Sequence, residues 1–285
     1  MFRCFKTILG ASVIGGVLWG LMIKIPHFFK IILGTSVIVG VLLGLWRWTY
    51  DKSCFSLVFV LLILGIVAYS YISLKMHQRK CFAKCFVNSE SFLSKMLHSP
   101  IMVSCFYYIF SIFTSISIAY SVLDYNWMMW GIVFCTIVVC AAVFGVFEEM
   151  LKSIIKEDYL MLMSREVSAF VGALFFIGLS CYVIYHGNMS DYLKPALIDT
   201  IKAASDSAYS NCDYTSYVLE FKKMLEGVTW WGMHKAESMG LNKGFMVAGW
   251  VAFIIYNALS GIAISRLSAQ IIYWLSKYFR GEYGK

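Results

Sequence analysis

Five long stretches of this chain contain no charged side chain, and they constrain its fold more than any other feature of the sequence. A helix that crosses the hydrocarbon core of a bilayer, about 30 Å thick, needs about 20 consecutive apolar residues. In lipid, every backbone polar group must also be satisfied inside the structure, as a helix does for itself. The stretches therefore predict five transmembrane helices: Cys54–Leu74, Ile101–Leu123, Trp127–Phe147, Val167–Tyr185 and Gly244–Ser265.

The composition also indicates a membrane protein and not a soluble domain. The chain is 60% hydrophobic and 14% charged, whereas soluble domains are about 45–50% apolar and about 25% charged. The formal net charge of +8 agrees with the excess of Lys and Arg that membrane proteins carry on their cytoplasmic side. No aromatic and basic motif of a nucleic-acid module appears, so no nucleic-acid partner is predicted.

Two shorter apolar stretches, Thr7–Ile23 and Ile31–Trp46, come first and are at the lower limit of spanning length. They belong to a tandem repeat in which Phe5–Leu21 and Phe29–Leu45 agree at thirteen of seventeen positions. Both copies begin with a lysine next to the phenylalanine, although consecutive spans point in opposite directions. One copy is therefore expected to lie at the membrane interface or to span under strain.

Each copy of the repeat contains two glycines four residues apart, Gly16 with Gly20 and Gly40 with Gly44. This spacing places both glycines on one helix face and lets another backbone approach closely. One interpretation is that these faces pack together in a homo-oligomer. The alternatives are a tandem duplication with no mechanism behind it, and a signal peptide, which the first copy resembles except that it has no small-residue cleavage site.

The loops predict the orientation of the chain. Residues 75–100 and the tail 266–285 are rich in Lys and Arg, so both are expected in the cytoplasm, the tail with the C-terminus. The nearly neutral stretch 187–243 then lies outside. It contains two helical patterns, over 191–207 and 213–228, which predict a small helical cap over the outer membrane face.

Apolar periodicity also continues beyond two of the spans, over 147–163 and 262–279, where it alternates with charged residues. These segments are expected to be amphipathic cytoplasmic arms. The predicted fold is thus all-α: a polytopic transmembrane helix bundle of five strong spans and two shorter N-terminal ones, with a helical extramembrane cap and cytoplasmic arms. Its parts are the duplicated segments 1–50, the bundle 51–186, the outer loop 187–243 and the last span with its basic tail, 244–285.

Polar side chains inside the predicted spans are few. Asp, Glu, Lys, Arg and His are absent from all five stretches, which argues against a proton-coupled pump, a metal-ion transporter or a voltage sensor. One span carries a stripe of hydroxyl groups on a single face, formed by Ser104, Tyr108, Ser111 and Ser115. These residues are candidates to line a pore, but hydroxyl groups also bond to their own helix or join two helices.

Three further residues are candidate pore groups. Asn257 lies in the middle of the last predicted span, where a lone Asn can also bond to a neighbouring helix. Glu148 and Glu149 stand at the cytoplasmic end of a span, where an oligomer would arrange them as an acidic ring that selects cations. The simpler interpretation is that these carboxylates mark the boundary between membrane and water.

Cysteine and motif patterns predict no chemistry. Most of the nine cysteines, Cys54 among them, lie in apolar runs, where a thiol behaves as a small hydrophobe. Cys181 and Cys212 share the expected outer side, so a disulfide between them is a hypothesis. No phosphate-binding loop, catalytic triad or zinc-ligand pattern is present. The sequence therefore predicts no enzyme, no cofactor and no metal site.

These features favour an oligomeric ion channel or pore-type effector in a bacterial inner membrane. It would be surrounded by lipid and gated by a ligand or a cytoplasmic protein at the basic loop 75–100 or the tail 266–285. The alternative is a non-catalytic structural subunit of a membrane-embedded envelope or secretion complex. A small-solute transporter ranks third, because the inverted repeats expected of that class are missing.

Overall fold

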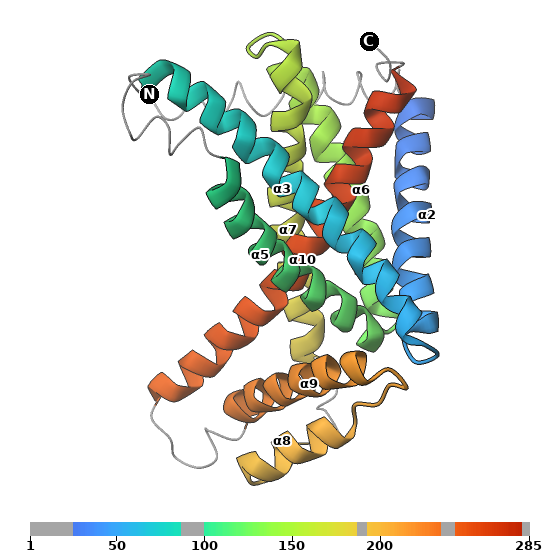
Figure 1. Ribbon diagram of the computed structural model, residues 1–285, viewed down its shortest axis with the longest axis vertical. Coiled ribbons are helices and arrows are strands. Elements are labelled where there is room, and N and C mark those ends of the chain that lie inside the picture. Colours follow the sequence, from blue (N-terminus) through green and yellow to red (C-terminus); the bar gives the residue numbers. More distant parts are fainter. Residues whose placement is uncertain (1–24, 87–99, 187–192, 235–242, 281–285) are drawn as a thin grey trace.

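The structure is a computed structural model that describes residues 25–86, 100–186, 193–234 and 243–280, and almost all of this part of the chain is helical (Figure 1). The long helices are α2 (Ile25–Thr49), α3 (Leu57–Phe86), α5 (Pro100–Ser121), α6 (Trp127–Leu151), α7 (Glu157–His186), α8 (Leu197–Asp206), α9 (Asp213–His234) and α10 (Lys243–Phe279). Short 3-10 turns at Cys54–Ser56 and Val122–Asp124 precede α3 and follow α5.

Six helices in the described part of the chain are long and apolar enough to cross a membrane, which is compatible with a multi-pass membrane protein. Their spanning windows are Phe28–Thr49, Cys54–Ser73, Ser104–Asp124, Trp127–Leu151, Tyr159–Val183 and Phe253–Phe279. The second copy of the repeat lies in α2, one of these six helices. The first copy, with Gly16 and Gly20, lies outside the described residues.

The last helix, α10, runs through the middle of the bundle, and this corrects two predictions. It packs against α2, α3, α5, α6 and α7. Its spanning window is Phe253–Phe279, further along the chain than the predicted Gly244–Ser265. The segment 262–279, predicted to be a cytoplasmic arm, is instead the most buried part of the helix, with fully buried Leu267 and Ile271. Its polar residues lower the local hydropathy, but the surrounding helices shield them from both lipid and water.

The other predicted arm and the tail are corrected in the same way. The segment 147–163 is not one helix, because α6 ends at Leu151 and α7 begins at Glu157 after a short turn. The turn reverses the chain so that α7 returns along α6. Residues 266–279 of the predicted tail belong to α10, and most of them are buried in the bundle.

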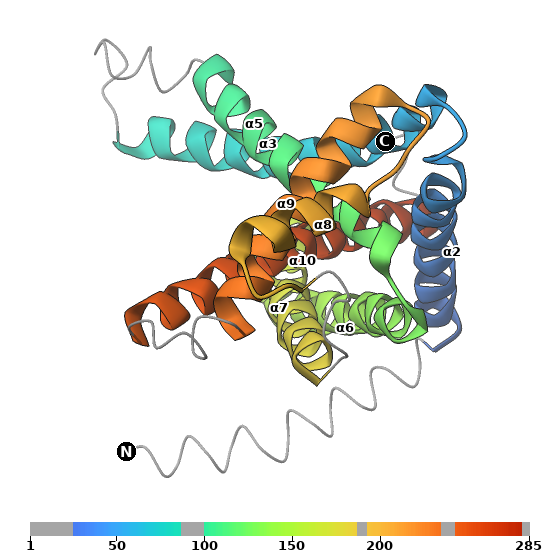
Figure 2. The same cartoon turned by 90° about the horizontal axis from the view of Figure 1, so that it is seen from below.

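Helices α8 and α9 lie across one end of the bundle, which we call the cap end (Figure 2). They correspond to the two helical patterns predicted within 187–243. The chain segments that link α2 to α3 and α5 to α6 reach the same end, whereas α2 begins and α10 ends at the opposite end (Figure 1). The described parts of the stretch expected outside, 193–234, therefore lie at the cap end together with these two links.

Candidate functional site

Three charged side chains of the long apolar helices lie together inside the bundle. Arg165 and Glu166 come from α7, and Arg266 comes from α10. The prediction that ionisable residues are absent from the spans is therefore wrong. The error has a simple physical origin: the predicted spans were ended at the first charge, at Val167 and Ser265, whereas the helices continue past these charges and bury them.

Arg165 is the centre of this network. Its side chain is 1% exposed, and a guanidinium group has five N–H donors. The Nε and Nη2 atoms donate to Glu166 Oε1 at 3.2 and 2.8 Å. Nη2 also donates to the Ser70 carbonyl at 3.0 Å. Nη1 donates to Gln270 Oε1 at 2.7 Å and to Ser73 Oγ at 3.2 Å. Every donor is therefore engaged, and the arginine joins α3, α7 and α10.

Glu166 connects the two arginines. Its Oε1 atom accepts from Arg165, and its Oε2 atom forms an ion pair with Arg266. The arginines also lie over aromatic rings, with the guanidinium carbon of Arg266 4.6 Å from the ring centre of Tyr71. For Arg165 and Tyr273 that distance is 5.5 Å. Two positive charges and one negative charge leave the network with one excess positive charge.

Arg165 lies about two helical turns from the start of its apolar window, toward the end of the bundle opposite the cap. Arg165 is six residues after Tyr159, the first residue of its span, which at 1.5 Å per residue is about 9 Å. Several buried polar atoms near it on the same helices have no hydrogen-bond partner: Ser70 Oγ, Ser164 Oγ, Ser268 Oγ and Gln270 Nε2. They are donors, so none of them offsets the excess positive charge as a carboxylate would.

This arrangement suits a structural role better than ligand binding. A ligand could reach Arg165 only by displacing one of its five hydrogen bonds, and its side chain is closed to solvent. Within the described ranges, no three His, Cys, Asp or Glu side chains gather to hold a metal ion. The network instead joins α3, α7 and α10 and so fixes their register against one another.

The hydroxyl stripe on α5 is divided between two environments. Tyr108 is 48% exposed on the outside of the bundle, and Ser104 is half-buried. Ser111 is buried and donates to the Tyr107 carbonyl of its own helix at 2.7 Å. Ser115 is buried, and its Oγ atom has no partner. The four residues therefore lie in different environments, and Ser111 and Ser115 lie in the packed interior.

The remaining predicted residues lie in separate places. Asn257 is buried and donates to the Phe253 carbonyl of its own helix at 2.9 Å. Glu148 forms an ion pair with Arg280, and Glu149 is exposed and also has a partner. A methyl group added at Gly40 or Gly44 would meet nothing within 4 Å, so this pair of glycines faces away from the protomer's own helices.

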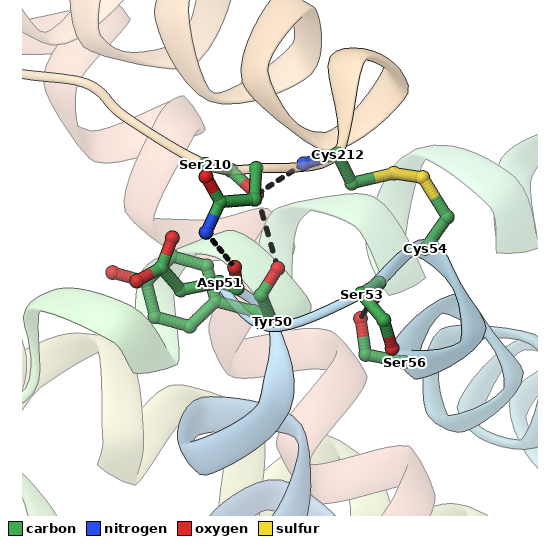
Figure 3. Close-up of a disulfide and its surroundings, with 8 residues drawn as sticks. Tyr50, Asp51, Ser53, Cys54, Ser56, Ser210 and Cys212 are labelled. Atoms are coloured by element: carbon green, nitrogen blue, oxygen red, sulfur yellow. Dashed lines mark hydrogen bonds between the residues drawn. A yellow bond between two sulfur atoms is a disulfide. The ribbon is translucent and has the colours of Figure 1, made fainter.

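The structure pairs Cys54 with Cys212, not Cys181 with Cys212. The two Cα atoms are 5.0 Å apart, within the range that a disulfide needs, and Cys181 is free. Figure 3 shows how the chain around the bridge is held, with the Ser210 hydroxyl donating to the Tyr50 carbonyl at 3.0 Å. Cys54 begins an apolar run, which suggested a buried thiol, but it lies at the exposed start of that run.

A second connection between the cap and the bundle was also missed in the sequence. Asp124 follows α5 and pairs with both Lys222 and Lys223 of α9. Lys222 also donates to the Tyr120 carbonyl at 3.0 Å. About 100 residues separate the partners, so no local pattern in the sequence predicts this contact.

Comparisons with protein-family models, curated proteins and solved structures find nothing that matches this chain. The fold itself shows an all-helical arrangement with six helices long and apolar enough to cross a membrane, compatible with a multi-pass membrane protein, whose central helix is joined to its neighbours by buried charges.

Proposed function

We propose that this protein is a non-catalytic membrane subunit that acts by assembling with other membrane-embedded chains. One observation carries the proposal: the charged groups between its long helices are paired with one another, while the outer faces of these helices expose apolar side chains. Arg165, Glu166 and Arg266 form a closed network, and Asp124 and Glu148 pair with basic residues at the two ends. This chemistry holds the protomer together and leaves its outer faces for contact.

Most of the residues that the sequence suggested for a pore are buried among helices or paired within the chain. Their surroundings suit packing better than the lining of a pore. Ser111 and Ser115 are buried among helices. Asn257 bonds to its own helix. Glu148 is paired with Arg280, whereas a selecting ring would need carboxylates that face the ion.

The outward face of α2 is the surface best suited to another helix. Val37, Gly40, Val41, Gly44 and Trp48 follow the three- and four-residue spacing of one helix face. The valines and Trp48 are exposed, and the space beside both glycines is open. Two glycines on such a face let a second backbone approach closely, which is the basis of many helix contacts in membranes.

A photo-crosslinking experiment tests this proposal. The crosslinking residue p-benzoyl-phenylalanine replaces Val41 on α2 or, as the matched control, Phe170 on α7, which is exposed to a similar degree. In native membranes we expect a protein adduct from position 41 and only lipid adducts from position 170. Adding Gly40→Leu should abolish the protein adduct, because the side chain fills the open space. Lipid adducts alone at position 41 would refute the assembly role of this face.

The second candidate is the oligomeric ion channel, and the same face of α2 favours it, because copies joined there would place a path between protomers. Flux separates the two functions. The subunit proposal predicts that the pure protein in sealed liposomes passes no ions above the rate of empty vesicles. Ion flux from the pure protein that Gly40→Leu removes would replace the subunit proposal with the channel.

We also infer an orientation for the protein, with the cap end outside the cytoplasm and the C-terminus inside, in a bacterial inner membrane. Disulfides persist in oxidising compartments, and the Cys54–Cys212 bond is at the cap end. Lys277 and Arg280 lie at the opposite end, where α10 finishes, and an excess of Lys and Arg marks the cytoplasmic side. The two criteria are independent and agree.

A further inference from the structure

Helix α9 carries a row of exposed apolar side chains. Its members are spaced by three or four residues and therefore lie on one helix face. Two other faces of α9 are occupied, because Leu219 packs against the bundle and Gly227 lies close to Ala204 of α8. The exposed row, which we call the α9 stripe, consists of Tyr214, Tyr217, Phe221, Leu225 and Val228.

The depth of α9 follows from what it packs against. Leu219 contacts a cluster with Trp46 and Tyr120, which lie three and four residues before the ends of their spans at Thr49 and Asp124. At 1.5 Å per residue these contacts are about 5–6 Å inside the ends of the spanning helices. Helix α9 therefore rests against the spans themselves and does not stand above them in water.

The thickness of the membrane interface then places α9 among the lipid headgroups. A bilayer is about 30 Å thick in its hydrocarbon core and about 40–45 Å thick with both headgroup layers, so each layer is roughly 5–8 Å. A helix with its side chains is about 10–12 Å wide. A helix that crosses the span ends, as α9 does in Figure 1, fills this layer.

The exposed residues around α9 match this depth. The stripe contains two tyrosines and a phenylalanine, and exposed Trp48, Phe55 and Trp127 lie at the same end of the bundle. Aromatic side chains of this kind are enriched where lipid meets water. Helix α8, on the far side of α9 (Figure 1), exposes Asp199, Lys202 and Asp206 beside one apolar residue, Ile198, so its outer surface is mostly charged.

We infer that α9 is an interfacial helix whose stripe inserts into the lipid leaflet at the cap end, at the boundary between headgroups and acyl chains. Helices with one apolar face bind membranes in this way. The contact is with lipid of any headgroup charge, because Lys222 and Lys223, the lysines of α9, are already paired with Asp124. The cap is then held both by the bundle and by the bilayer.

A crosslinking experiment on the full-length protein tests this inference. The photo-crosslinker p-benzoyl-phenylalanine replaces Phe221 or Tyr217 in the stripe, or Lys202 on α8 as the matched control. The protein is placed in nanodiscs of phosphatidylcholine, with or without phosphatidylglycerol, and irradiated. We expect mass spectrometry to show a one-lipid adduct at positions 221 and 217 in both lipid mixtures, and no lipid adduct at position 202.

An intact Cys54–Cys212 bond on a non-reducing gel shows that each variant has folded. In folded protein, a crosslink from positions 221 and 217 to a second copy would overturn the inference and make the stripe a subunit contact. Loss of lipid adducts at both positions would overturn it as well, and so would an adduct that needs phosphatidylglycerol. None of these results depends on whether α2 recruits another chain.

Discussion

At the scale of single residues, the main finding is that a fully buried arginine has all of its donors satisfied. Moving a charge out of water is costly, and this cost is repaid only where geometry and hydrogen bonds are good. Arg165 meets this condition through Glu166, Gln270, Ser73 and the Ser70 carbonyl. No sequence pattern shows this, because all partners except the adjacent Glu166 lie on α3 and α10, about 100 residues away along the chain.

The order of importance within the network can be predicted. Glu166→Gln leaves two buried arginines without a counter-charge, so we expect a loss of about 3–5 kcal/mol in the free energy of unfolding. Arg266→Gln leaves the neutral pair Arg165–Glu166, and the Arg266 side chain is 17% exposed, so its loss should be smaller. Thermal unfolding in detergent compares the two variants. Equal losses, or the reverse order, would show that the network is not organised around Glu166.

At the scale of helices, the closest approaches occur at glycines that the repeat did not point to. A Cβ atom at Gly172 of α7 would lie 2.2 Å from Cys140 Sγ of α6 and 3.3 Å from Ser265 Oγ of α10. Nearby, the Ser168 hydroxyl donates to the Cys140 carbonyl at 2.7 Å. Three helices therefore meet at Gly172, which lets α10 lie close to α7 in the middle of the bundle.

We expect Gly172→Ala to destabilise the protein by about 1–3 kcal/mol, the usual cost of overpacking an interior. Gly178→Ala on the same helix is the matched control, because nothing lies within 4 Å of a Cβ atom there. It should be neutral, or stabilising by up to about 1 kcal/mol through the higher helix propensity of Ala. Thermal unfolding in detergent measures both variants. Adding Cys140→Ala to Gly172→Ala should recover stability, and if it does not, contact with that thiol is not the cause.

Much of the helix pattern could be predicted from the sequence, because hydropathy reports directly on what lipid tolerates. The windows that begin at Cys54, Ser104 and Trp127 lie close to the predicted spans, and α8 and α9 overlap the helical patterns predicted at 191–207 and 213–228. The path of α10 could not be predicted. Hydropathy assumes that a helix is surrounded by lipid or water, whereas α10 is surrounded by other helices. For this reason the segment with Arg266 and Gln270 was predicted to be a cytoplasmic arm.

At the scale of the whole molecule, the cap is tied to the bundle at separated points. The Cys54–Cys212 bond joins it to the segment between α2 and α3, and Asp124 joins it to the end of α5 through two lysines. The residues joined by the disulfide are 158 apart in sequence. Sequence reasoning treated Cys54 as a buried apolar thiol and proposed only Cys181 as the partner of Cys212, because sequence position does not show which cysteine is near enough to bond.

The disulfide makes the choice between the two cysteine pairs testable. Cys54→Ser and Cys212→Ser should each lower the free energy of unfolding by about 2–5 kcal/mol, because the open chain gains freedom in the unfolded state. Cys181→Ser is the matched control and should change it little, since that thiol is free. A reductant should lower the unfolding temperature of the wild type and of Cys181→Ser, but not that of Cys54→Ser any further. Destabilisation by Cys181→Ser together with an inert Cys54→Ser would restore the Cys181–Cys212 pairing, and with it a cap held by α7 instead of by the start of α3.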